Sequence, residues 1–418
     1  MQLMLANRKA YRLSAAVIGL GLFASNTPSP LYHTYSTIWH FSPLTLTLIY
    51  ATYAFGVLAT LLLAGRASDE VGRRPVLLAA LGLLMASTVL FMLARSAAWL
   101  FAARGLQGLA TGAAISAASA ALIDLHPRHD PSGVGLTNGV ASAAGLGLGA
   151  LSSSAIVELG YAPRILPYVV LFALFALAFA GVLRMPESVQ NRRRFRLTFD
   201  RPHVPSVARR RFALASLAVL SSWSIGGLFF SIGPQLGAHL FASGNALVDA
   251  IGIVTLAGAA ALSQLVLGRT SPWVGASAGS IALAAGMLLI IAAAETDSSV
   301  AYVVGTVVAG AGFGIAFLGG LRALVAVIPP EQRAATMAAF YIVAYASLSV
   351  PAVLAGVVVT HLGLDSTFEL FGSIAAALAL VVAFEAWRTR PRPLGAQPEL
   401  AREPRATVRR HRDSTATG

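Results

Sequence analysis

The segment 65–75, which reads GRASDEVGRRP, holds the densest group of residues in this chain that could do chemistry. If the segment is helical, the carboxylate of Asp69 and the guanidinium of Arg73 lie on one face, because residues four apart are neighbours on a helix. Gly65 and Gly72 allow a tight reversal, since glycine tolerates positive φ and lets another segment approach closely. The pattern indicates an ion pair at a sharp turn between two apolar stretches.

A second polar group lies inside the apolar stretch 98–122. Arg104 and Gln107 are three residues apart and therefore share a helix face, while Gly108 and Gly112 have the four-residue spacing that lets helices pack closely. An arginine within an apolar stretch is costly, so it usually faces the protein interior or a water-filled cavity, although it can also snorkel to the nearer surface. We therefore propose Arg104 and Gln107 as residues that contact a solute or take part in proton coupling.

Prolines interrupt the first apolar stretch. Pro28 has no N–H to donate to the carbonyl of Ala24, so free carbonyls offer polar contacts there, unless the prolines simply end the helix. Further candidates for contact with a solute, or for proton coupling, are Asn26, Tyr32, Trp223, Phe229, Gln235, Tyr341 and Tyr345. The aromatic members suit an aromatic, fairly apolar solute, although such residues are also common in a plain core. The glycines of the stretch 134–158 with a helix-packing role are Gly139, Gly145 and Gly149.

The elements that position these residues are long apolar helices. The chain of 418 residues is 56% hydrophobic and only 11% charged, whereas a soluble globular protein has about 25% charged residues. A helix needs about 20 apolar residues to cross the hydrocarbon layer, which predicts an all-α polytopic membrane protein with twelve spans. The expected spans are 13–33, 43–64, 75–94, 98–122, 134–158, 165–184, 212–236, 246–267, 273–294, 299–321, 335–360 and 367–387.

The basic residues set the expected orientation and explain the formal net charge of +13. Nearly all arginines outside the spans lie in alternate connections, which places these connections and both termini in the cytoplasm. We expect a cytoplasmic tail at 1–12, a six-helix bundle at 13–184, a basic linker at 185–211, a second bundle at 212–388 and a disordered tail at 389–418. Lys9 is the single lysine among 30 basic residues, and this bias, with the high alanine and glycine content, suggests a GC-rich bacterial genome. We therefore expect the protein in a bacterial cytoplasmic membrane. Charge used for orientation argues against nucleic-acid binding.

The chain contains no cysteine, which excludes disulfides, thiolate metal sites and cysteine nucleophiles. The histidines have no acidic partner at a diagnostic spacing, so we expect no catalytic residue, no metal and no cofactor. The two halves are weakly alike: the arginine- and glycine-containing stretch 104–128 has a counterpart at 310–333, an offset of roughly 200 residues that suggests pseudo-symmetric six-helix bundles.

Five positions of the segment 65–75 resemble the signature of the major facilitator superfamily, namely Gly65, Asp69, Gly72, Arg73 and Arg74. Ala67 and Glu70 depart from the family, which usually has leucine and a basic residue at these places. A plain charged turn would carry similar charges but would not need this spacing. The family's fourth-span pattern is matched by Leu100, Arg104, Gln107, Gly108 and Gly112.

The resemblance implies two bundles that rock about a central site and open to each side of the membrane in turn. It also implies that the segment 65–75 latches the inner side of the first half, with Asp69 and Arg73 joining Asp124 in a charge relay. We therefore expect that Asp69→Asn leaves the protein folded and abolishes transport. No acid lies clearly in the middle of a span, and Asp124, at the inner end of the span 98–122, is the best acidic candidate for proton coupling.

The leading hypothesis is a monomeric, proton-coupled exporter of small drug-like or metabolic compounds. An importer or facilitator of sugars or organic anions is the second transporter hypothesis, with Arg104 favouring an anion if it reaches the cavity. A membrane-embedded enzyme, such as a lipid-modifying transferase, would need an acid, histidine or serine cluster at a membrane face. A signalling protein that keeps the fold without transport is the remaining alternative.

Overall fold

The computed structural model describes residues 2–126, 131–189, 202–329 and 332–390, and all regular structure in these ranges is helical. Twelve helices of seventeen residues or more lie within these ranges. In the first half they are α1 (Gln2–Asn26), α3 (Pro43–Ala64), α5 (Arg73–Met92), α6 (Ala97–Leu125), α7 (Pro131–Glu158) and α8 (Leu166–Leu183). In the second half they are α9 (Arg209–Phe241), α11 (Ile251–Leu267), α12 (Pro272–Glu295), α13 (Ser299–Val325), α14 (Arg333–Leu362) and α15 (Leu364–Arg388).

Short helices occupy several connections. They are η1 (Ser29–Leu31), α2 (Tyr32–Trp39), α4 (Ala67–Glu70), η2 (Ser206–Ala208) and α10 (Ala246–Asp249). The predicted linker 185–211 therefore includes η2 and the start of α9, and its residues 190–201 lie outside the described ranges. The predicted tail begins where α15 ends, but residues 391–418 also lie outside the description.

Among the described residues, ten helices are long and apolar enough to cross a membrane. The two other long helices are α11, which is apolar but has only 17 residues, and α1, which starts with a basic segment. The chain is thus an all-α, multi-pass membrane protein whose twelve long helices correspond in order to the twelve predicted spans.

The helix that corresponds to the first predicted span, 13–33, has other limits. α1 runs without interruption from Gln2 to Asn26, so the residues of the predicted tail that the structure describes, 2–12, are helical. The helix stops before Pro28, because the carbonyl of Ala24 cannot receive a backbone N–H from proline. The chain then continues through η1 and α2 instead of completing a single span.

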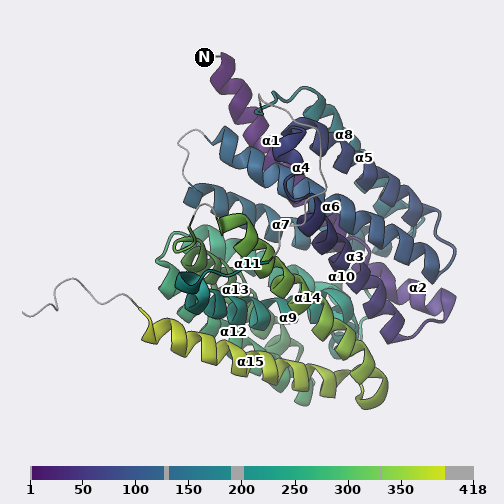
Figure 1. Cartoon of the computed structure of the whole chain (residues 1–418). Helices are drawn as coiled ribbons and strands as arrows, with labels where there is room; N and C mark the ends of the chain where they lie inside the picture. Colours follow the sequence, from purple (N-terminus) through teal and green to yellow (C-terminus); the bar gives the residue numbers. More distant parts are fainter. Residues whose placement is uncertain (1, 127–130, 190–201, 330–331, 391–418) are drawn as a thin grey trace, which may run out of the picture.

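The helices form two groups, each built from one half of the chain, as Figure 1 shows by the separation of purple and blue from green and yellow. In the first group α6 packs against α3 and α5, and α1 packs against α7. In the second group α12 packs against α13 and α15. The two groups meet mainly where α3 lies against α14 and where α7 lies against α11.

Glycines bring the helices of the first half into backbone contact. A Cβ atom at Gly108 of α6 would overlap the carbonyl of Tyr53 in α3, and one at Gly112 would lie 2.9 Å from the carbonyl of Val57. In the same way, Gly145 and Gly149 of α7 lie directly against the carbonyls of Gly19 and Phe23 in α1. Such close approach maximises van der Waals contact between helices that gain little from the hydrophobic effect in lipid.

Gly139 makes a different contact, because it lies between the two halves. A Cβ atom at this position of α7 would overlap the side-chain amide oxygen of Gln264 in α11. A Cβ atom added at Gly147, two turns further along α7, would lie 3.3 Å from the Cβ atom of Ala257 in α11. Small residues therefore line one of the two main seams between the bundles.

Candidate functional site

The segment 65–75 forms a tight turn between α3 and α5. Gly72 has φ 115°, a conformation that favours glycine, and it separates the one-turn helix α4 from α5. Gly65 has φ −58°, so only Gly72 of these two glycines adopts a positive φ. Asp69 and Arg73 do not share a continuous helix either, and the reversal at Gly72 is what brings them together.

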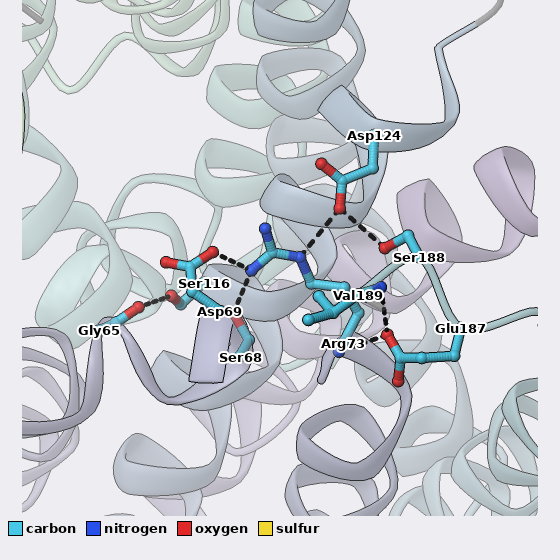
Figure 2. Close-up of polar contacts among 9 residues, drawn as sticks. All are labelled: Gly65, Ser68, Asp69, Arg73, Ser116, Asp124, Glu187, Ser188 and Val189. Atoms are coloured by element: carbon cyan, nitrogen blue, oxygen red, sulfur yellow. Dashed lines mark hydrogen bonds and ion pairs between the residues drawn. The ribbon is translucent and has the colours of Figure 1, made fainter. Parts of the chain in front are cut away.

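Arg73 is the centre of a cluster at this end of the bundle, shown in Figure 2. Its guanidinium forms an ion pair with Asp69 through Nη1, donates from Nη1 to Ser68 Oγ at 2.9 Å, and donates from Nε to Asp124 Oδ2 at 3.0 Å. The Arg73 side chain is only 10% exposed, whereas Asp124 is 30% and Asp69 59% exposed. A nearly buried cation is thus held by two carboxylates from α4 and α6, an arrangement we call the Arg73 latch.

Two residues that the sequence did not suggest complete the Arg73 latch. Glu187 accepts the backbone N–H of Arg73 at 2.9 Å and that of Arg74 at 3.1 Å, so its negative charge caps the N-terminus of α5. Ser188 donates its hydroxyl to Asp124 at 2.8 Å. A signal did exist, because Glu187 is one of two acids in the basic stretch 185–211. Arg74 also donates to the carbonyl of Leu183 at the end of α8.

Arg104 is fully buried in α6, which rules out a snorkelling side chain. Its Nε donates to the hydroxyl of Tyr32 at 2.7 Å, and its Nη1 donates to the carbonyl of Ser25 and to Gln107 Oε1, each also at 2.7 Å. Gln107 in turn donates to the carbonyl of Ala24 at 3.0 Å, the acceptor that Pro28 leaves free. The end of α1 is therefore bonded by side chains of α6 in place of its own backbone.

Three tyrosine rings surround the Arg104 guanidinium. The carbon Cζ lies 5.5, 5.8 and 5.3 Å from the ring centres of Tyr32, Tyr50 and Tyr53, within the range of cation–π attraction. Within the part of the chain that the structure describes, its Nη2 has no hydrogen-bond partner and no carboxylate forms an ion pair with it. We call this group, with Gln107, the Arg104 site.

Asn26 is placed close to the Arg104 site but is bonded elsewhere. Its amide donates to the carbonyl of Leu146 in α7 at 3.1 Å, which fixes the end of α1 against the neighbouring helix. Among the candidates from the first half, Tyr32 and Gln107 therefore contact Arg104 directly, while Asn26 supports the helix end beside it.

The candidates from the second half fall into two groups. Trp223 of α9 lies edge-on to Tyr345 of α14 with ring centres 5.5 Å apart, and both are partly exposed. Tyr341 is one turn before Tyr345 on α14 and is also partly exposed. Gln235 is partly exposed further along α9, past Pro234.

Phe229 differs from these partly exposed candidates of the second half. It is fully buried and packs between Tyr302 of α13 and Phe368 of α15, at centroid distances of 6.3 and 5.7 Å. In this structure its ring fills the core of the second half, and its contact with a solute stays a prediction. The aromatic composition of α9 did not reveal which face of the helix looks toward the first half.

A family model described as the Major Facilitator Superfamily matches residues 13–317 of this sequence. The chain belongs to that superfamily. The human organic anion transporter MFSD10 (TETRAN), a solved structure, is similar in fold, with a TM-score of 0.66 and 17% sequence identity over 91% of this chain and 99% of that one. No curated protein matches the sequence. The predicted family is thus confirmed, and the chain is a secondary transporter rather than an enzyme.

In this superfamily member, the polar candidates form two sites rather than one. Arg104 and Asp124 are 20 residues apart on α6, which separates them by about 30 Å along the helix. The Arg73 latch lies at one end of the first half, and the Arg104 site lies near the other end, beside the seam with the second half. The helix α6 therefore carries one residue of each site, Arg104 of the Arg104 site and Asp124 of the Arg73 latch.

Proposed function

We propose that this transporter exports small drug-like or metabolic organic compounds by alternating access, in exchange for protons. The observation that carries the proposal is the Arg73 latch, in which a nearly buried guanidinium joins α4, α5 and α6 at a single turn. Asp124 and Asp69 remain 30% and 59% exposed, so these ion pairs are worth less than the about 3–5 kcal/mol lost when one partner of a fully buried pair is removed. Each step of about 1.4 kcal/mol still shifts a two-state equilibrium about tenfold. A cluster of this kind has enough energy to bias which side of the carrier is open.

The seam between the halves suits a rocking motion. At the end opposite the Arg73 latch, Ser29 Oγ donates to the carbonyl of Phe230 at 2.9 Å, and Glu158 accepts the backbone N–H of Ala246, also at 2.9 Å. Both bonds join the first half to the second, and both must break before that end can open. They involve few groups, so their rupture is compatible with repeated opening.

Proton exchange is the part of the proposal that depends on Asp124. Among the described residues, the buried charged side chains are Arg73 and Arg104, and no carboxylate is buried. Asp124 is partly buried and bonded to both Arg73 and Ser188, so adding a proton to it would weaken the Arg73 latch directly. This links protonation to the conformational equilibrium without a separate acid in the middle of the membrane.

The solute is expected to be largely apolar. Trp223, Tyr341 and Tyr345 offer aromatic surface near the seam, whereas the amides and carboxylates that sugar recognition needs are few there. The printed name of the similar human structure concerns organic anions, but an identity of 17% supports the fold alone. We place the carrier in a bacterial cytoplasmic membrane as a monomer, with both termini in the cytoplasm and with lipid and small molecules, not nucleic acid, as its partners.

The test is transport by purified protein in liposomes with an imposed proton gradient, screened against dyes, antibiotics, organic acids and sugars. Solute movement that follows the gradient, and acidification or alkalinisation that follows the solute, would support proton exchange. Downhill movement with no response to the gradient would contradict proton coupling while leaving alternating access in place. Comparing right-side-out with inside-out vesicles of cells that express the protein tests the direction of export.

A further inference from the structure

The Arg104 site contains a buried positive charge that the described protein does not neutralise. The oxygen atoms bonded to Arg104 belong to a hydroxyl, a carbonyl and a side-chain amide, which are all uncharged. An arginine side chain is not deprotonated in proteins, and a buried charge is costly unless it is paired and hydrogen-bonded. Arg104 therefore retains binding capacity for an anion, with its Nη2 as the donor that has no partner among the described residues.

The surroundings of Arg104 lead to the seam between the halves. Tyr50, which lies under the guanidinium, packs in one hydrophobic cluster with Leu228 of α9 and Leu348 of α14. Tyr345 of α14 packs against the same cluster. One of the rings that cover the cation therefore packs against the second half, and separation of the halves would uncover it.

Beyond Tyr345 the aromatic surface continues in the second half. Trp223 lies 5.5 Å from the ring of Tyr345 and 5.3 Å from that of Phe317. Aromatic rings thus lie on both sides of the seam, with the positive charge of Arg104 at one end. A molecule with an anionic group and an apolar or aromatic body matches both features.

We propose that Arg104 binds the carboxylate of an organic anion that this protein transports, while the apolar body of that anion lies along Tyr50, Tyr53, Tyr345 and Trp223. The inference rests on the proposed transport function and specifies the class of its solute. A carboxylate would accept from the free Nη2 of Arg104, and the planar guanidinium favours such a planar partner. The tyrosine rings contribute apolar contact area on both sides of the seam.

The first measurement compares two ligands of the same shape on the purified full-length protein in detergent. Naphthalene-2-carboxylate and naphthalene-2-carboxamide differ in charge but present the same ring system. We expect the carboxylate to raise the melting temperature in a concentration-dependent manner and the amide to have little effect at equal concentration, since a ligand stabilises the state that binds it. Equal effects of both compounds, or equal stabilisation by sodium sulfate, would overturn a carboxylate site at Arg104.

The second measurement uses a matched pair of charge deletions. Arg104→Gln removes the proposed anion donor, whereas Arg95→Gln removes an exposed arginine from the connection between α5 and α6. We expect Arg104→Gln to weaken carboxylate binding at least about tenfold, because hydrogen bonds to charged groups are the stronger kind, and Arg95→Gln to leave it unchanged. Unchanged carboxylate affinity in a folded Arg104→Gln protein would contradict the inference.

Arg104→Lys covers the possibility that Arg104→Gln does not fold. Lysine keeps the charge but loses the planar fork, so we expect weaker but measurable carboxylate binding and the same preference over the amide. Folding of each variant is checked by its melting temperature without ligand and by a monodisperse elution profile. Affinity equal to that of the unmodified protein would show that the guanidinium does not hold the anion.

Transport separates this inference from the function on which it rests. If liposomes with the protein move a neutral or cationic compound, and the naphthalene carboxylate neither binds nor competes, the anion site is refuted and the carrier function stands. If the carboxylate binds through Arg104 but no compound crosses the membrane, the carrier function is refuted and the binding site stands. Saturable carboxylate uptake that Arg104→Gln abolishes supports both.

Discussion

Two arginines of the first half have opposite electrostatic environments. Arg73 is 10% exposed and is bonded to two carboxylates, whereas Arg104 is fully buried and, among the described residues, has an ion pair with none. The charge that lies deeper in the protein is therefore the one without a counter-ion. The difference suggests two tasks: Arg73 is saturated by the protein and holds a conformation, and Arg104 is left open to a ligand.

The largest effect is expected when the cation of the Arg73 latch is removed, which tests whether Arg73 and Arg104 have separate tasks. Arg73→Gln removes the nearly buried cation and leaves Asp69 and Asp124, which are 59% and 30% exposed, without their shared partner. We expect the rate of solute transport in liposomes to fall roughly 100-fold while carboxylate binding at Arg104 persists.

The exchange of Arg73→Asp together with Asp124→Arg is the control for this deletion, since it restores one ion pair with reversed polarity. Partial recovery of transport would support an electrostatic latch. Normal transport by Arg73→Gln alone would show that the cluster has no role in the cycle.

The two sites can also be separated by a change distant from both. Gly145→Ala forces a methyl group against the backbone of Gly19 and should displace the end of α1, whose carbonyls hold Arg104 and Gln107. We expect a loss of about 1–3 kcal/mol in stability, typical of overpacking, and weaker carboxylate binding. Thermal unfolding and ligand titration measure the two effects.

Gly135→Ala is the matched control on the same helix, because a Cβ atom there meets no atom of the described residues within 4 Å. It should leave both the melting temperature and carboxylate binding close to those of the unmodified protein. If the two alanine variants behaved alike, close packing of α1 on α7 would not be what positions the Arg104 site.

Removing the charge of either carboxylate of the Arg73 latch should reduce transport, but by different amounts for Asp69 and Asp124. Asp69 is 59% exposed and Asp124 only 30% exposed, and exposed ion pairs are worth about 0.2–1 kcal/mol. The structure thus lowers the expected effect of Asp69→Asn from abolished transport to a reduction of a few-fold, with a larger loss for Asp124→Asn. Parallel uptake assays of the two variants, at equal protein per liposome, decide the ranking.

The smallest effect is expected at Ser188, which contributes one neutral hydroxyl to the latch. Ser188→Ala removes its bond to Asp124, and a single hydrogen bond is worth about 0.5–1.5 kcal/mol. Transport should fall less than in Asp124→Asn. A loss as large as in Arg73→Gln would mean that the start of the linker, and not the ion pair, controls the latch.

The fold could be predicted from the sequence to a large extent, because each apolar stretch long enough to cross lipid must form a helix whatever its neighbours do. The order of the long helices and the superfamily follow from this constraint together with the spacing of Gly65, Asp69, Gly72, Arg73 and Arg74. The predicted first span ended at residue 33, whereas α1 ends at Asn26. Pro28 cannot donate a hydrogen bond to the carbonyl of Ala24, and whether the helix ends there depends on which group donates to that carbonyl instead. Here the replacement comes from Gln107 of another helix.

The sites depended on tertiary structure to a greater degree. The sequence alone pointed to Arg104, Gln107 and Asp124, because charged and amide groups in apolar stretches need partners wherever they lie. Only the packed structure decided that Phe229 faces a core, that Glu187 caps α5, and that Arg104 has neutral partners. A helical sequence defines which residues share a face, whereas the neighbour that each face meets is determined by how twelve helices fit together.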